Sequence, residues 1–259
     1  MFLSLFKQKP LLDPNSTQWI TDTFAWALEN FELSVFKQDS QLILPSNKFY
    51  PGNVNSVHEM AQSVFENTLK YAGMQNWPIV LVEPQAFNQK IMPQVDLSAE
   101  LRGEKAKISV ASDQAIEVSY NPNQINQPQD LVASFAQAFA TILLIQSQKL
   151  PPGGKEFVSQ SIDLIACFMG FGVMFANTAY QFKGGCGSCY NPYANRTAAL
   201  SEQEVLYCLA LFSALKSIPA KKVTSELKSH LKSDYKKALK EIDNLLSKKP
   251  SPVLLAAAH

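Results

Sequence analysis

The sequence predicts an α+β protein that is mostly helical and has a small β-sheet in its first half. Short β-branched runs alternate with helical patterns up to residue 120, and long helical patterns follow from residue 128. Of the 259 residues, 46% are hydrophobic, so the chain can bury a substantial core. We expect an N-terminal α/β portion (1–95), a helical portion in the same compact unit (96–250) and a tail (251–259).

Composition argues against several classes of protein. Lys and Arg number 23 against 22 Asp and Glu, so the chain has no strong overall field to attract nucleic acid or an anionic membrane. The opening "MFLSLFK" lacks the basic start of a secretory signal, and four cysteines are too few for a disulfide framework. The longest near-apolar run (164–176) is shorter than the roughly 20 residues of a membrane span. We therefore expect a soluble, cytoplasmic protein with no transmembrane segment and no nucleic-acid partner.

Two helices and two strands are predicted in the first 85 residues. Residues 14–36 carry apolar side chains at helical spacing, and "SQLILP" (40–45) predicts a short strand. Residues 53–74 form a second helical pattern that ends at a glycine. The run "WPIVLVEP" (77–84) is short, β-branched and bounded by prolines, which predicts a buried strand.

The middle of the chain predicts a loop, two strands and a helix. Residues 86–105 are polar and mixed, which indicates a surface loop or a weak boundary. Residues 105–120, "KAKISVASDQAIEVSY", alternate as two strands joined by a turn at 112–114. An apolar helix is then predicted over 128–148, because Pro128 suits the first helical position.

Three further helices are predicted after residue 150. The first covers 156–182 and contains "GFG" (170–172), for which we expect close approach of another helix, since each helical glycine costs about 1 kcal/mol. The second, 201–217, opens with a capping box. The third, 221–248, has an apolar stripe opposite a lysine-rich face.

The order of these elements carries a resemblance to a known family. Residues 105–216 run from a strand pair through "LVASFAQAFATILL", "PPGG" and "SxxxDLIACFMGFGVMFAN" to "LSEQEVLYCLALF". This order resembles an uncharacterised bacterial family of zincin-like, gluzincin-type metallopeptidases. In that family the first helix carries His-Glu-x-x-His and the next carries Glu-x-x-x-Asp. The resemblance implies a zincin-like core, in which a small sheet covers one side of the 128–148 helix and the later helices pack behind it.

The residues at the family's functional positions differ from those of an active enzyme. Two histidines one helical turn apart hold Zn²⁺, a glutamate acts as base, a carboxylate completes the ligands, and an aspartate orients one histidine. The resemblance places those roles, in that order of histidine, base, histidine, carboxylate and aspartate, at Gln137, Ala138, Thr141, Ser159 and Asp163. Only Asp163 keeps the family's residue type.

This degenerate motif predicts a protein without zinc or hydrolytic activity. Neutral Gln and Thr oxygens replace imidazole poorly on Zn²⁺, and Ala138 cannot accept a proton from water. We expect a non-catalytic relative of zinc metallopeptidases, with no cofactor and with a structural role or a peptide or protein bound in the vestigial cleft. Outside this context, the same residues describe an ordinary amphipathic helix and a hydrogen-bonded buried carboxylate.

Two other classes of function stay open. Cys186 and Cys189 form a C-x-x-C pair in a glycine-rich loop, which could rebuild a metal or redox site with Asp163 in an active enzyme. A zinc site would need two more ligands, and an ordinary loop is the alternative. The basic helix 221–248 could dock on an acidic partner or a membrane, although such a helix is more often a solvated face.

Overall fold

The protein is α+β and mostly helical, as the sequence predicts. The structure is a computed structural model that describes residues 9–52, 56–88, 91–97, 100–110, 115–179, 193–248 and 250–258. The helices are α1 (Pro14–Asn30), α2 (Leu33–Gln38), α3 (Val57–Tyr71), α4 (Pro128–Ser147), α5 (Val158–Ala166), α6 (Gly172–Thr178), α7 (Glu202–Leu215), α8 (Ala220–Thr224), α9 (Lys232–Leu246) and α10 (Pro252–Ala258). The strands are β1 (Ile79–Val82), β2 (Val95–Leu97), β3 (Ile108–Val110) and β4 (Ile116–Ser119).

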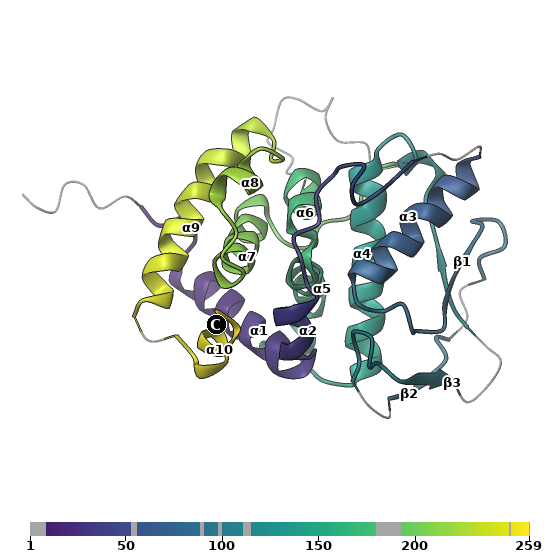
Figure 1. The fold of residues 1–259 in the computed structure, drawn as a ribbon, viewed down its shortest axis with the longest axis horizontal. Coiled ribbons are helices and arrows are strands. Elements are labelled where there is room, and N and C mark those ends of the chain that lie inside the picture. The colour runs from purple at the N-terminus through teal and green to yellow at the C-terminus, as the bar shows by residue number, and fades with distance from the viewer. Residues whose placement is uncertain are drawn as a thin grey trace, which may run out of the picture.

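Helix α4 stands between the strands and the other long helices. Figure 1 shows the strands and α3 on one side of α4, with α5 and α6 on the other side and α9 farthest from the strands. One hydrophobic cluster extends through these layers and includes residues from Leu11 to Ala257. The core therefore joins residues from both portions of the chain that the sequence distinguishes.

The four strands form two separate pairs rather than one sheet. β1 lies parallel to β4, with Ile79 opposite Ile116, and β2 lies antiparallel to β3, with Val95 opposite Val110. The predicted hairpin over 105–120 is therefore wrong, because its two strands belong to different pairs, and its turn lies outside the described residues. Alternation indicates which runs are extended, but strands of three or four residues contain too little pattern to identify a partner.

Two predictions about the first half are corrected at its strands. β2 lies within the predicted loop 86–105. β1 is only partly buried, since Ile79 is 7% exposed and Val80 is 42% exposed, whereas the sequence predicts a buried strand. Leu81 and Val82 are half-buried, so only the first residue of β1 is buried as predicted.

The predicted helix 14–36 is broken where a buried arginine binds its carbonyl end. α1 ends at Asn30, and Glu32 has a φ of 55° before α2 begins. Arg102 is fully buried and donates from Nε to the Ala72 carbonyl at 2.8 Å and from Nη1 to the Phe31 carbonyl at 3.4 Å. Its charge therefore lies at the negative ends of both α1 and α3, a favourable position for a cation.

The predicted strand 40–45 contacts a helix instead of a sheet. Its Leu42 and Ile43 are buried, as an apolar run should be, but the Ile43 N–H donates to the Gly170 carbonyl at 3.0 Å. Gly170 has a φ of 105° and lies in the π-helical turn Cys167–Phe171 that separates α5 from α6. The predicted continuous helix 156–182 is therefore interrupted at this turn.

The glycines around this turn have different structural reasons. A Cβ atom at Gly172 would lie 3.0 Å from Leu209 Cδ1 on α7, so the predicted close approach of another helix is confirmed there. A Cβ atom at Gly170 would overlap the carbonyl oxygen of Gln41. Gly170 thus combines a left-handed backbone with close passage of an unrelated segment.

The C-terminal part also departs from its predicted form. The predicted helix 221–248 is divided into α8 and α9, with a 3₁₀ turn at Ser229–Leu231 between them. The predicted tail 251–259 contains α10, whose Leu254 is fully buried. α10 packs against α1, so these residues belong to the core.

Within the part of the chain that the structure describes, two helical stretches are long and apolar enough to cross a membrane by length and composition. They are Pro128–Ser147 and Gly154–Thr178, and each is mostly buried inside the fold. Helices in the core of a globular protein show the same apolar character on all sides. The burial accounts for their composition without a membrane.

We expect Gly170→Ala to destabilise the protein much more than Gly154→Ala. Both glycines have positive φ, at 105° and 70°, but a Cβ at Gly154 meets nothing within 4 Å. Gly154→Ala should therefore lower the free energy of unfolding by about 1 kcal/mol from backbone strain alone. Gly170→Ala adds the clash with Gln41 and should cost about 3 kcal/mol or more. Urea unfolding measures both, and equal effects would contradict the close passage at Gly170.

Candidate functional site

Two of the five zincin-type positions are brought into contact. Gln129 near the start of α4 accepts a hydrogen bond from Asn177 of α6 at 2.8 Å. Eight residues later along α4, Gln137 Nε2 donates to Asp163 Oδ1 of α5, also at 2.8 Å. α4 therefore runs antiparallel to the α5–α6 pair.

The other three positions offer little to a ligand. The Thr141 hydroxyl donates to the Gln137 carbonyl at 2.8 Å, within its own helix. Ala138 is partly buried and packs against the hydrophobic core. Ser159 is exposed on α5. The polar side chains that interrupt the apolar pattern of α4 are thus explained by local and interhelical hydrogen bonds.

Asp163 is a fully buried carboxylate that collects several donors. Besides Gln137, the backbone N–H groups of Ala199 and Leu200 donate to its Oδ2 at 2.8 and 3.2 Å. Arg196 Nη1 lies 3.4 Å from the same oxygen and completes a buried ion pair. Such multiple donation offsets the large cost of burying a charge. Asp163 therefore fastens the segment before α7 to α5.

Arg196 links this carboxylate to α6 and to the start of α4. Its Nε donates to Thr178 Oγ1 at 2.8 Å, and its guanidinium lies over the Phe175 ring, 4.0 Å from the centroid. Its backbone N–H donates to Asp130 Oδ1 at 3.1 Å. Together with Asp163, these contacts join three helices through one residue. Sequence reasoning did not select Arg196.

A signal for this arginine was nevertheless present in the composition. The chain contains 21 lysines but only two arginines, Arg102 and Arg196. Both arginines are buried, at 0% and 4% exposed. A guanidinium presents five donors in a fixed plane and suits buried, directed hydrogen bonds better than an ammonium group. Rare arginines in a lysine-rich chain therefore point to fixed structural positions.

A metal ion needs several ligating side chains that lie close together. Among them, no group of three or more His, Cys, Asp or Glu side chains could hold a metal ion. The C-x-x-C pair Cys186 and Cys189 lies outside the described residues. Cys167 and Cys208 are buried free thiols inside helical segments, where burial raises the pKa of Cys208.

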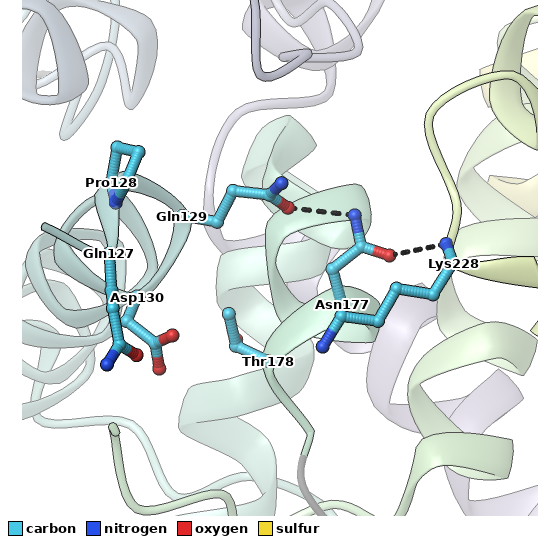
Figure 2. Close-up of a pocket in the computed structure, with 7 residues that line it drawn as sticks. All are labelled: Gln127, Pro128, Gln129, Asp130, Asn177, Thr178 and Lys228. Carbon is cyan, nitrogen blue, oxygen red and sulfur yellow. Dashed lines mark hydrogen bonds between the residues drawn. The ribbon is translucent and has the colours of Figure 1, made fainter. Parts of the chain in front are cut away.

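A polar cavity of about 370 Å³ opens at the first turn of α4. Figure 2 shows Asn177 between Gln129 and Lys228, donating to the Gln129 side chain and accepting from the Lys228 backbone N–H. Arg196 supports this wall because it binds two lining residues, Asp130 and Thr178. The lining residues are Gln127, Pro128, Gln129, Asp130, Asn177, Thr178 and Lys228.

A second cavity, of about 360 Å³, shares Pro128 and Gln129 with the first. It lies between the segment before α3, α3 itself, α4 and α6. Its described lining residues are uncharged and mostly apolar: Pro45, Ser46, Asn47, Tyr50, Pro51, Gly52, Met60, Ser63, Val64, Pro128, Gln129, Val132 and Met174. We call the two adjoining cavities the α4 groove.

Comparisons with family models, curated proteins and solved structures found no match for this chain.

We expect Arg196→Met and Asp163→Asn to have strongly non-additive effects on stability. Arg196→Met leaves the Asp163 charge buried without its cation and should lower the free energy of unfolding by about 3 kcal/mol or more. Because the two residues share one network, the double variant should lose at least about 1 kcal/mol less than the sum of the single effects. Chemical denaturation of all four proteins gives the coupling.

The matched control is Lys236→Met, which removes an exposed cation from α9. Its effect should stay within about 0.5 kcal/mol. Two outcomes would contradict the proposed role of the ion pair. One is that the losses of unfolding free energy in Arg196→Met and Asp163→Asn add up in the double variant, and the other is that Arg196→Met loses no more than Lys236→Met.

Proposed function

We propose that this chain is a non-catalytic, zincin-like protein that binds an extended peptide segment in the α4 groove. One observation carries the proposal. An uncharged apolar cavity and an amide-lined polar cavity adjoin each other and share Pro128 and Gln129. Peptide recognition commonly combines pockets for apolar side chains with hydrogen-bonding groups for the main chain. The proposal keeps the zinc-free state and the cytoplasmic location expected from the sequence.

The contact between Gln137 and Asp163 supports the zincin-like part of the proposal. In zincin chemistry, an aspartate at this position accepts a hydrogen bond from a metal-ligating histidine and orients its ring. Here the Gln137 amide donates to Asp163 at 2.8 Å instead. The other carboxylate oxygen, Oδ2, is bonded by Arg196 and by two backbone N–H groups. A structural network thus takes the place of a metal centre.

The apolar cavity fits uncharged side chains of a ligand. Its volume of about 360 Å³ is near the lower end of the usual range for ligand pockets, roughly 300–1,000 Å³. Met60 and Met174 lie in its walls, and methionine adapts its shape to different apolar groups. A charged side chain would lose its hydration there without finding an opposite charge. We infer a preference for apolar residues at this position of the peptide.

The polar cavity fits the main chain that would continue from such a residue. The Gln129 and Asn177 side chains bond to each other at 2.8 Å. The Gln129 Nε2 group takes no part in this bond, so it can donate to a C=O group of an extended peptide. The Asp163 and Arg196 network holds Asp130 and Thr178 in this wall, which keeps the cavity in shape before a ligand arrives.

We expect Met60→Lys to weaken peptide binding strongly while Gln62→Lys leaves it unchanged. Peptides selected from a random display library on the wild-type protein serve as probes, and fluorescence anisotropy measures their affinity. Met60→Lys places a charge in the uncharged cavity and should weaken binding by roughly tenfold or more, or about 1.4 kcal/mol. Gln62 lies on the same helix but does not line the groove.

Thermal unfolding must be unchanged in both variants, so that a loss of binding reports the groove. Selected peptides that bind both variants equally would contradict the groove as the binding site. Failure to select any apolar peptide would contradict peptide binding.

We expect a zinc site to form when the four lost residues are restored together. The variant Gln137→His, Ala138→Glu, Thr141→His and Ser159→Glu should bind one Zn²⁺ per chain, because Asp163 already accepts from position 137. Elemental analysis after dialysis gives the stoichiometry. The control Gln137→His alone should bind none. A folded quadruple variant without zinc would contradict the zincin-like geometry.

A further inference from the structure

A third cavity, separate from the α4 groove, lies where the first turns of α1, α5 and α7 meet. Its volume is about 370 Å³, and it shares no lining residue with the groove. We call it the Trp19 pocket, and its lining residues are Asn15, Ser16, Trp19, Phe157, Gln160, Ala199 and Glu204.

Two aromatic rings form a fixed wall of the Trp19 pocket. The centroids of Trp19 and Phe157 are 5.3 Å apart, with the rings tilted by 37°. Trp19 Nε1 donates to the Pro152 carbonyl at 2.9 Å, which holds the indole in place. Phe157 packs closely over Gly153, where no Cβ could be accommodated. The negative π faces of such rings attract cations.

The polar groups of the pocket provide acceptors and one negative charge. Glu204 is the one charged residue among the described residues that line it. The Gln160 Oε1 atom is buried and has no hydrogen-bond partner within the described structure. An ammonium group can donate up to three hydrogen bonds and accepts none, so it matches such a site.

The positive helix ends beside the pocket are already neutralised. Asp13 Oδ1 accepts from the backbone N–H groups of Asn15 and Ser16 at the start of α1. At the start of α7, Ser201 and Glu204 form a capping box, with the Ser201 N–H donating to Glu204 Oε2 at 2.8 Å. Capped helix ends attract anions less, so the Glu204 and Asp13 carboxylates dominate the local charge.

We propose that the Trp19 pocket binds a small organic cation, namely an ammonium group carried on an alkyl chain. The rings contact the alkyl chain and attract the charge, Glu204 pairs with the ammonium, and Gln160 accepts one of its protons. A metal ion fits the pocket less well, because aromatic rings are not ligands and a single carboxylate provides too few oxygens. This site is independent of peptide binding in the α4 groove.

Titration with n-butylammonium chloride tests the proposal, with 1-butanol as the neutral probe of similar shape. The binding is followed on the full chain through the indole N–H signal of Trp19 in NMR spectra, identified with Trp19→Phe. Wild-type protein should bind the ammonium more tightly than the alcohol. Equal affinity for the two probes, or no shift of the Trp19 signal with the ammonium, would overturn the proposal.

Glu204→Gln is the decisive variant, because glutamine at this position can keep the capping box while the charge is removed. It should weaken n-butylammonium binding by roughly tenfold and leave 1-butanol unaffected. The matched control is Glu202→Gln, which removes a charge from the same helical turn outside the pocket and should change affinity less than about twofold. Phe157→Leu should weaken the binding of n-butylammonium more than the binding of 1-butanol. Equal losses in Glu204→Gln and Glu202→Gln would show a general field effect and overturn the site.

Discussion

The ion pair between Arg196 and Asp163 connects α5 with α6 and with the segment before α7. The glycine turn at residue 170 separates α5 from α6, so no continuous helix fixes their relative direction. Arg196 contacts Asp163 on α5 and Phe175 and Thr178 on α6, and thereby spans the turn. The same residue binds the start of α4 through its backbone, which places the wall of the α4 groove. Loss of this ion pair would therefore affect both the relative direction of α5 and α6 and the wall of the α4 groove.

The two arginines share one physical task at two different junctions of the fold. Arg102 binds the carbonyl ends of α1 and α3, and Arg196 joins α4, α5 and α6. In both cases a planar guanidinium donates to groups buried at a junction between helices: the Ala72 and Phe31 carbonyls at Arg102, and the Asp163 carboxylate and Thr178 hydroxyl at Arg196. Lysines, in contrast, populate the surface of α9, where a flexible ammonium stays hydrated. The division follows from the chemistry of the two side chains.

Local signals in the sequence were sufficient where an element has both a cap and a long apolar pattern. α4 and α7 were predicted nearly to their ends, because a proline at the first helical position marks the start of α4 and a capping box marks the start of α7. Strand partners and the break at Glu32 were not predictable, since both depend on residues far along the chain. The resemblance singled out Gln137 and Asp163, and the structure joins the two by a hydrogen bond. Arg196 and the α4 groove were not predicted, because they lie in loops and at helix ends, where the sequence shows no periodic pattern.

The hydrogen bond from Ile43 to Gly170 also bears on how the chain folds. Its two ends are 127 residues apart, so the early segment has no partner until most of the polypeptide has been synthesised. The buried side chains of Leu42 and Ile43 would remain exposed to solvent during that interval. The first portion therefore completes its packing late, as part of the whole chain. A fragment that ends before α5 would carry an apolar surface suited to chaperones.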